Sequence, residues 1–310
     1  MKVVFFGSPA VALPALNALL AAGHEIKLVV TQPDRPAGRG KKLTPPPVKV
    51  FALNHQLEII QPQKIRQDEQ ALEKIKAASP EVNVVVAYGQ IIPASIIYLP
   101  KYKSLNVHFS LLPKYRGAAP VAWAILNGDQ YTGVTIMQLN EKMDEGPILA
   151  REIVPILPRE NTQELETRLA HVGAELLVKT LSQIDSIIPQ EQDQAQATYA
   201  PKITKEQGKI NWSEPAEVID RKVRAFYPWP GAYTFLNGQR LEIISGVALP
   251  GLMPDSKPGE IVRVDKSGFY VRCGGGNLYL IEKVKPEGKK EMTAYAYSLG
   301  NRVLAGATFT

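Results

Sequence analysis

Cysteine is nearly absent from this chain of 310 residues, since Cys273 is the single example. One cysteine excludes an internal disulfide and leaves no thiol cluster for a metal ion, which is typical of a reducing compartment. The chain also lacks any run of the roughly 20 apolar residues that a membrane helix needs. Its apolar run at residues 3–7 is too short for a signal peptide. We therefore expect a cytoplasmic protein without a membrane contact.

Apolar strands and helical segments alternate through the first half of the chain. Strands are predicted at residues 1–7, 25–31 and 82–88, and helices at residues 11–22 and 69–78. This alternation predicts βαβ units and an α/β fold with a mostly parallel, Rossmann-like sheet. The G-x-G-x-x-G spacing of dinucleotide-binding proteins is missing after Gly7, which argues against a nicotinamide cofactor.

Two polar side chains stand in the apolar strand predicted near residues 105–108. Asn106 and His108 are two positions apart, so both lie on the same side of the strand and can converge on one small group. Pro113 and Gly117 then interrupt the apolar pattern and predict a loop before a helical segment at residues 118–126. Open α/β sheets usually build their sites at such strand ends.

A carboxylate follows in the turn at residues 143–147, where Asp144 precedes Gly146. If this turn folds against the strand end, Asp144 can hydrogen-bond one imidazole nitrogen of His108 and leave the other nitrogen as a donor. Asn106 adds an amide N–H, and each good donor stabilises an oxyanion by roughly 3 to 4 kcal/mol. The alternative is structural, because strand-end amides and imidazoles and turn-capping aspartates also occur without catalysis.

Strong side-chain nucleophiles are lacking around this cluster. Ser110 has no evident base beside it, and Cys273 lies in a glycine-rich strand of the last third. The attacking group should therefore belong to a substrate, which points to direct transfer between two bound molecules.

Residues 32–44 are basic and rich in glycine and proline. They hold one anion, Asp34, and four cations, which are Arg35, Arg39, Lys41 and Lys42. We expect an exposed, mobile loop that forms neither helix nor strand. Such a loop is either solvated surface or an arm that orders on phosphate groups.

The composition changes in the last third of the chain. Residues 190–200 are rich in Gln with few large apolar side chains, which predicts a linker. From Lys209 on, short apolar runs between Gly, Pro or Asn residues predict a small β-barrel, a common nucleic-acid platform. We expect one domain at residues 1–189, a linker at 190–208 and a second domain at 209–310.

Positive charge is concentrated in the second predicted domain. Residues 209–310 hold 14 Lys and Arg against 10 Asp and Glu, which accounts for 4 of the formal net charge of +6. This favours an anionic partner, with nucleic acid as the leading candidate. A solvated basic surface of this size is about equally common.

The run from Asn106 through Pro113 to Gly117, followed by Asp144 and Gly146, resembles the signature of the folate-dependent formyltransferases. Residues 32–42 and 87–90 extend the match and are similar to the branch of this family that acts on methionyl-tRNA. The resemblance covers nearly the whole chain and is weakest in the last hundred residues. It implies a Rossmann-like catalytic domain followed by an OB-like β-barrel that helps to hold tRNA.

The resemblance also implies three groups of site residues. The catalytic residues are Asn106, His108 and Asp144. The folate-binding residues are Ser110, Leu111, Leu112, Pro113, Ala87, Tyr88, Gly89 and Gln90. The tRNA-binding residues are Arg35, Arg39, Lys41 and Lys42. No metal ion is implied.

The implied reaction is formyl transfer from 10-formyltetrahydrofolate, a co-substrate, to the α-amino group of methionine esterified to initiator tRNA. The uncharged amine attacks the formyl carbon, Asn106 and His108 stabilise the oxyanion, and Asp144 orients His108 and helps to relay the proton to the folate nitrogen. The implied partners are the initiator methionyl-tRNA and the folate, and we expect a monomer.

One departure from the family pattern is Phe109, where a small residue is usual beside the histidine. Alternation along the strand directs Phe109 away from His108, so this departure concerns packing rather than chemistry.

Two other functions remain open. The first is a folate-dependent formyltransferase that acts on a small amine, such as a nucleotide sugar or a purine precursor, and it would not need the basic loop. The second is an RNA-binding protein whose formyltransferase half has lost activity, and retention of Asn106, His108 and Asp144 argues against it.

Overall fold

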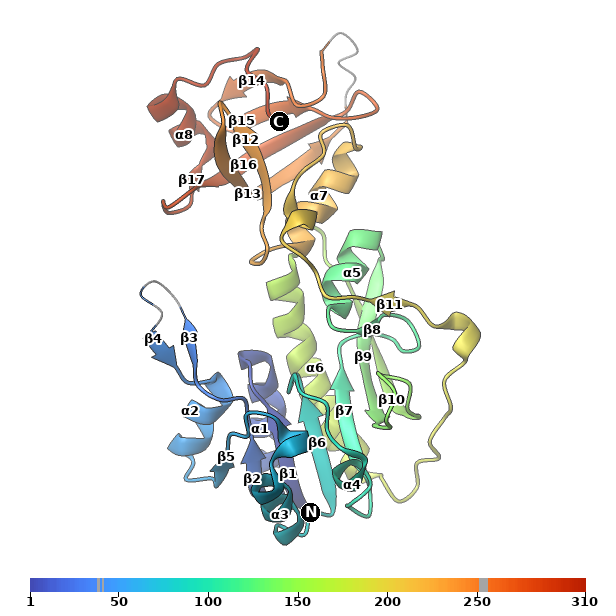
Figure 1. Cartoon of the computed structure of the whole chain (residues 1–310). Helices are drawn as coiled ribbons and strands as arrows, with labels where there is room; N and C mark the ends of the chain where they lie inside the picture. Colours follow the sequence, from blue (N-terminus) through green and yellow to red (C-terminus); the bar gives the residue numbers. More distant parts are fainter. Residues whose placement is uncertain (38–39, 41, 251–255) are drawn as a thin grey trace. The chain divides into compact units, whose positions relative to one another are not determined.

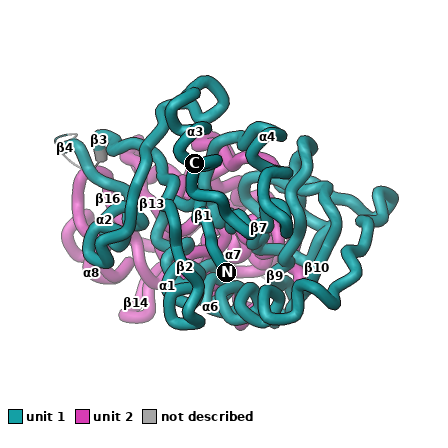
Figure 2. Tube along the Cα trace, turned by 90° about the horizontal axis from the view of Figure 1, so that it is seen from below, with its two compact units in different colours: residues 1–120, 131–155, 166–200 teal, residues 121–130, 156–165, 201–310 magenta. Residues whose placement is uncertain are grey.

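The computed structural model describes residues 1–37, 40, 42–250 and 256–310. The chain forms two compact units (Figure 2). Unit 1 contains residues 1–120, 131–155 and 166–200, and unit 2 contains residues 121–130, 156–165 and 201–310. Within the described residues, no helix combines the length and the apolar character needed to cross a membrane.

Unit 1 is built on a seven-stranded sheet (Figure 1). Across the sheet the strands follow the order β10 (Ile148–Pro155), β9 (Tyr131–Gln138), β7 (Ser104–His108), β6 (Val82–Val86), β1 (Lys2–Gly7), β2 (Glu25–Val30) and β5 (Ile59–Ile60). The strands from β7 to β5 are parallel, whereas β9 and β10 are antiparallel to their neighbours. The prediction of a mostly parallel sheet is confirmed.

Helices cover both faces of this sheet, because its central strands are apolar on both sides. Every residue of β6 is buried, as expected for a strand with helices above and below. The helices and helical turns of the chain up to residue 182 are α1 (Leu13–Ala21), α2 (Pro47–Asn54), α3 (Glu69–Ala77), α4 (Ala94–Ile97), α5 (Pro120–Asn127), α6 (Thr162–Ser182), η1 (Ala10–Ala12) and η2 (Ile65–Gln67).

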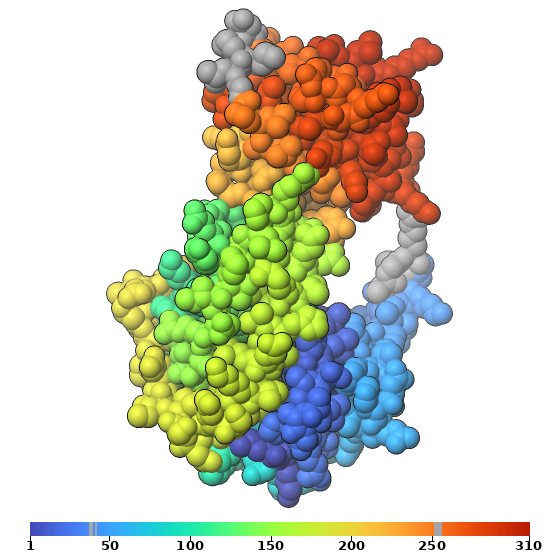
Figure 3. All heavy atoms as spheres, turned by 180° about the vertical axis from the view of Figure 1, so that it is seen from behind, coloured from blue at the N-terminus to red at the C-terminus, as the bar shows by residue number. Residues whose placement is uncertain are grey.

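The two faces of β7 have different neighbours. On one face, Val107 and Phe109 lie against Gly173 of α6, where an added Cβ atom would come within 2.8 Å of Val107 and 3.6 Å of Phe109. Asn106 and His108 occupy the opposite face, so the prediction that Phe109 points away from His108 is confirmed. Figure 3 shows the outer side of α6 on the surface of unit 1.

Helix α6 begins with a capping box formed by Asn161 and Glu164. The Asn161 side chain accepts a hydrogen bond from the Glu164 N–H at 3.0 Å, and the Glu164 carboxylate accepts one from the Asn161 N–H at 3.0 Å. This reciprocal capping box satisfies two N–H groups that the first turn would otherwise leave unpaired.

The strand order reverses between β1 and β6. The chain leaves β1 toward β2 and β5 on one side, and returns with β6 on the other side. Open α/β sheets bind ligands outside the carboxyl ends of the strands at such a point. Ser8 follows β1 and Ala87 follows β6, so these residues stand at the position where such sheets bind ligands.

Unit 2 contains a six-stranded antiparallel sheet. Its elements after residue 200 are η4 (Glu206–Gly208), α7 (Ala216–Ala225), β12 (Ala232–Leu236), β13 (Gln239–Leu249), β14 (Ile261–Asp265), β15 (Gly268–Arg272), β16 (Leu278–Pro286), β17 (Met292–Thr293) and α8 (Ala294–Asn301). Close to the C-terminus, Phe309 bridges to Leu236 and Thr308 bridges to Glu260, so these residues pair with segments at both edges of the sheet. An antiparallel β domain after the parallel sheet is confirmed.

The thiol of Cys273 lies in the core of unit 2 and is fully buried. Burial raises the pKa of Cys273 to about 12. We expect a thiol reagent at pH 8 to label the native protein at least about a hundredfold more slowly than the urea-unfolded protein, because the thiolate is the reactive form. A native rate equal to the unfolded rate would contradict this packing.

Candidate active site

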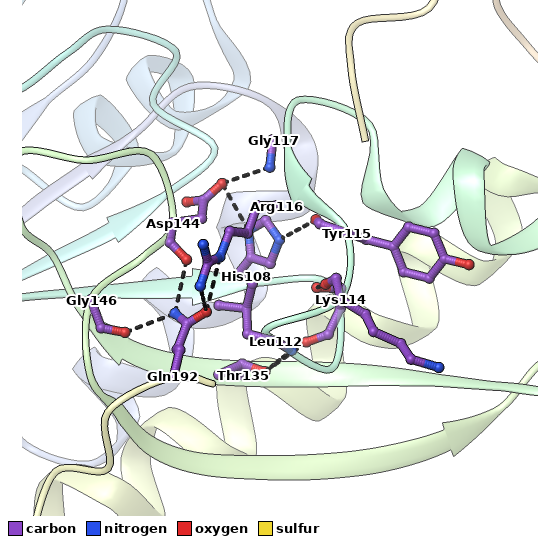
Figure 4. A network of polar contacts seen from close by, with 11 residues as sticks. His108, Leu112, Lys114, Tyr115, Arg116, Gly117, Thr135, Asp144, Gly146 and Gln192 are labelled. Carbon is purple, nitrogen blue, oxygen red and sulfur yellow. Dashed lines mark hydrogen bonds and ion pairs between the residues drawn. The ribbon is translucent and has the colours of Figure 1, made fainter. Parts of the chain in front are cut away.

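His108 ends β7 with its ring buried and 6% of its surface exposed. Its Nε2 lies 3.0 Å from the backbone carbonyl oxygen of Tyr115 (Figure 4). A carbonyl oxygen can only accept a hydrogen bond, so Nε2 must carry the proton in this contact. Nδ1 is therefore the nitrogen that remains for exchange of a proton with a substrate.

Asp144 lies on the other side of the ring. One carboxylate oxygen of Asp144, Oδ2, accepts a hydrogen bond from the Gly117 N–H at 2.9 Å and lies 3.8 Å from Nδ1 of His108. The structure therefore brings the two side chains together without the direct hydrogen bond that the sequence predicts. That expectation is wrong because the Tyr115 carbonyl holds the proton on Nε2, so Nδ1 has no hydrogen to donate to the Asp144 carboxylate.

The 3.8 Å separation leaves the facing atoms of His108 and Asp144 able to share a third group. An N–H or O–H group beside both atoms can lie within hydrogen-bond distance of each. Tyr115 and Asp144 both have left-handed backbone torsions, with φ of 62° and 53°. Such strained torsions in residues other than glycine cluster at functional sites.

Asn106 shares the sheet face of His108, two residues earlier in β7. Asn106 is partly exposed, and its side-chain amide makes no hydrogen bond within the described residues. An unengaged amide beside a buried imidazole is available to donate a hydrogen bond to a ligand.

The loop predicted to lie along a folate is held by a hydrogen bond within it and by two bonds to Thr135 of β9. The Ser110 hydroxyl donates to the Lys114 carbonyl at 2.6 Å, and Ser110 and Leu112 are both fully buried. The Thr135 hydroxyl donates to the Ser110 carbonyl and accepts from the Leu112 N–H. Only Leu111 and Pro113 remain partly exposed, so these two residues and the loop backbone can meet a ligand.

The segment after β6 presents backbone rather than side chains. Ala87 and Gly89 are exposed with φ of 48° and 79°, whereas Tyr88 is 2% exposed and burial raises the pKa of its hydroxyl. The Gln90 side chain is engaged, since it accepts from the Ile65 N–H at 2.8 Å and donates to the Pro62 carbonyl at 3.0 Å. Any ligand contact here would therefore come from the main chain.

The basic segment does contain strands, contrary to the sequence prediction. β3 (Arg35–Ala37) and β4 (Lys42–Thr44) form an antiparallel hairpin. A proline is tolerated in a two-stranded ribbon because one edge of each strand faces solvent. Hydrogen bonds from Gln61 and Lys49 to Asp34 hold the base of the hairpin and lower the pKa of that carboxyl.

Two of the four predicted tRNA-binding cations, Arg35 and Lys42, lie in this hairpin. Arg35 donates to the Gln32 side chain at 3.0 Å, and Lys42 is exposed at the start of β4. Arg39 and Lys41 lie outside the described residues. No group of three or more His, Cys, Asp or Glu side chains arranged to hold a metal ion occurs in the described part of the chain.

The sequence analysis did not predict two residues that support the site, Arg116 and Gln192. Arg116 is 1% exposed, and its guanidinium donates to the Gln192 side-chain oxygen from Nε at 3.1 Å and from Nη2 at 2.8 Å. Gln192 in turn donates to the backbone carbonyls of Asp144 and Gly146, each at 2.8 Å. Figure 4 shows Gln192 between Arg116 and these two carbonyls.

The glutamine-rich composition around Gln192 predicts a linker and carries no signal of this contact. In the structure, residues 190–200 belong to unit 1, where β11 (Tyr199–Ala200) pairs with β8 (Arg116–Gly117), and unit 2 resumes at Pro201. The segment also contains η3 (Gln194–Gln196).

The mostly parallel sheet brings an imidazole and a carboxylate together beside the end of β7, and comparison with known proteins identifies the family. The family described as formyl transferase matches residues 1–181, and the family described as formyl transferase, C-terminal domain, matches residues 202–302. The chain belongs to the formyl transferase family.

Some members of the family are similar to this chain over its full length. The chain is 47% identical over 308 residues to the methionyl-tRNA formyltransferase of Moorella thermoacetica, and 46% identical over 306 residues to that of Thiobacillus denitrificans. Each match covers 99% of this chain and 98% of the relative.

Solved structures share the fold at lower identity. An N-formyltransferase from Helicobacter canadensis, in complex with folinic acid and dTDP-3-aminofucose, has a TM-score of 0.66 at 19% identity and covers 91% of this chain and 98% of its own. HypX from Aquifex aeolicus with tetrahydrofolic acid has a TM-score of 0.61 at 16% identity, covering 96% of this chain, which spans 47% of that protein.

Proposed function

We propose that this protein transfers the formyl group of 10-formyltetrahydrofolate to the α-amino group of methionine esterified to initiator tRNA. The observation that carries the proposal is identity of 46% and 47% to two methionyl-tRNA formyltransferases over 99% of the chain. The arrangement of Asn106, His108 and Asp144 supports it, because these groups suit an acyl transfer between two bound molecules.

The amine of the acceptor attacks the formyl carbon in its uncharged form, and a carbon–nitrogen bond forms as the carbonyl becomes an oxyanion. The free amide of Asn106 donates to that oxyanion. Nδ1 of His108 and the Asp144 carboxylate lie 3.8 Å apart. These two groups take up the proton that the amine loses and pass it on to the folate. The bond from the formyl carbon to the folate nitrogen then breaks, and this nitrogen takes the proton.

Folate binding is assigned to the edge of the sheet where the strand order reverses. The exposed backbone at Ala87 and Gly89 suits the pteridine, and the partly exposed Leu111 and Pro113 suit an apolar ring face. Tyr88, Ser110, Leu112 and Gln90 act by shaping the backbone, because their side chains are buried or engaged.

The initiator methionyl-tRNA is assigned to the basic hairpin and to the C-terminal domain. Arg35, Arg39, Lys41 and Lys42 supply counter-charges for phosphates. The division into a catalytic domain at 1–189, a linker at 190–208 and a tRNA-binding domain at 209–310 stays a prediction, as do the cytoplasmic location and the monomeric state.

One assay tests the proposed function. Purified protein is incubated with 10-formyltetrahydrofolate and methionyl-tRNA, and the tRNA-linked product is hydrolysed and examined for formylmethionine. A parallel reaction contains a nucleotide-linked amino sugar, which is the acceptor class of the alternative function. Formylation of the sugar without formylation of the methionyl-tRNA would overturn the proposal.

Salt dependence tests the role of the basic hairpin. If four cations neutralise phosphates, the KM for methionyl-tRNA is expected to rise about a hundredfold between 50 and 200 mM salt. The double substitution Arg39→Glu and Lys41→Glu should raise this KM at low salt and flatten its salt dependence, while the KM for the folate changes less than about twofold.

A second double variant with the same change in net charge shows whether an effect on KM comes from the basic segment or from net charge alone. Lys76→Glu with Lys179→Glu removes two exposed lysines from α3 and α6 and should leave the KM for methionyl-tRNA nearly unchanged. Equal effects of the two double variants, or a joint rise of both KM values in the hairpin variant, would refute the assigned role.

A further inference from the structure

We propose that residues 192–200, which we call the strap, align His108 and Asp144 for the reaction, with Gln192 and Thr198 as positioning residues. The proposal deepens the proposed function and rests on it for the catalytic role of these two side chains. Every contact involved lies within unit 1.

Gln192 holds the turn that carries Asp144. Its amide N–H groups reach the carbonyls of Asp144 and Gly146, and its side-chain oxygen is fixed by two N–H groups of Arg116. Gln192 is 6% exposed, so water cannot easily replace these bonds. Because Asp144 has a strained φ of 53°, its orientation needs such external support.

Thr198 holds the loop that sets the tautomer of His108. Its hydroxyl accepts a hydrogen bond from the Tyr115 N–H at 2.9 Å, and its carbonyl accepts one from the Arg116 N–H at 2.9 Å. These two bonds fix the peptide groups on either side of Tyr115. The Tyr115 carbonyl is thereby aimed at Nε2 of His108, which keeps Nδ1 free on the substrate side.

The end of the strap fixes the donor to the Asp144 carboxylate. The Ala200 carbonyl accepts from the N–H groups of Ala118 and Ala119, and Gly117 lies against it, since an added Cβ atom would be 2.7 Å from that oxygen. The Gly117 φ of 121° is a conformation that side chains disfavour. This close approach places the Gly117 N–H 2.9 Å from the Asp144 carboxylate.

The first test replaces Gln192 with glutamate. Gln192→Glu keeps an oxygen for Arg116 but has no N–H groups for the two carbonyls. We expect kcat to fall at least tenfold, with both KM values within about twofold of wild type, and the pH profile of kcat to change. Gln183→Glu makes the same change on an exposed side chain and should leave kcat and its pH profile unchanged.

The second test measures the tautomer and needs no substrate. The chain has four histidines, so ¹⁵N-histidine spectra are simple, and the His108→Ala variant identifies the His108 signals. At a pH where the ring is neutral, wild type is expected to show the Nε2–H tautomer. Thr198→Val should give a mixture of both tautomers and lower kcat at least about threefold, and Thr198→Ser should restore the wild-type spectrum.

Three outcomes would overturn the proposal: an Nδ1–H tautomer in wild type, an unchanged spectrum in Thr198→Val, or a normal kcat in Gln192→Glu. If Gln192→Glu lowers the unfolding temperature, Gln192→Ala is measured in the same way at a temperature where both variants are folded. Failure of wild type to formylate methionyl-tRNA would instead refute the proposed function, while the tautomer spectra would still test the strap.

Discussion

Replacing His108 with alanine is expected to lower kcat at least about a hundredfold, the usual contribution of one general acid or base. The variant loses Nδ1, the nitrogen that faces Asp144 at 3.8 Å, and leaves Asn106 as the remaining donor near the site. Both KM values should stay within a few-fold of wild type, because in the proposed reaction the ring acts on the reacting atoms. Steady-state kinetics with methionyl-tRNA and 10-formyltetrahydrofolate measure the effect.

Two further variants test whether the loss of kcat depends on the position of the replaced residue. Asp144→Ala should also lower kcat at least about a hundredfold, since it removes the second group that we propose exchanges the proton. His171→Ala removes an exposed histidine on α6 and should retain full activity. A correctly folded His108→Ala protein that keeps most of its turnover would end the catalytic assignment.

Replacing Arg116 with alanine is expected to destabilise unit 1 by about 3 to 5 kcal/mol, the range for removing one partner from a buried charged network. The guanidinium is fully buried and bonds Gln192 and Gln194, with Glu145 at 3.6 Å. Its removal leaves the buried Gln192 oxygen without these bonds and opens a cavity. Calorimetry should show the corresponding transition roughly 10 °C lower.

An exposed arginine provides the control for this prediction. Arg263 pairs with Asp265 at 2.9 Å, and the two side chains are 60% and 39% exposed. Arg263→Ala should change stability by less than about 1 kcal/mol, because solvent screens such pairs. Equal effects of Arg116→Ala and Arg263→Ala would show that the buried network adds no stability.

Strand positions in unit 1 could be predicted closely, because the apolar pattern decides them. Val82, Val84 and Val86 are β-branched and fully or nearly fully buried, so their strand has little alternative. The period of two likewise predicts that Asn106 and His108 share one face. By contrast, the prolines at residues 45–47 suggest a loop, but α2 begins at Pro47. Proline is favoured in the first turn of a helix, so this pattern fits both structures.

The contacts inside the candidate site could not be predicted, because they depend on main-chain torsions. The expected bond from Asp144 to His108 needs a proton on Nδ1. The residue type of Tyr115 gives no sign that its backbone carbonyl points at Nε2 and holds the proton there. Gln192 is hidden for a different reason. Its neighbours have the composition of a solvated linker, and only the fold reveals that one glutamine is buried.

The strap has a consequence for protein synthesis, because the chain is made from its N-terminus. Asn106, His108 and Asp144 are synthesised before Gln192, so under the proposal the growing chain carries these side chains unaligned. We expect activity to appear only after residues 192–200 have emerged and paired with β8. A fragment that stops before the strap would hold all three reactive side chains and still work poorly.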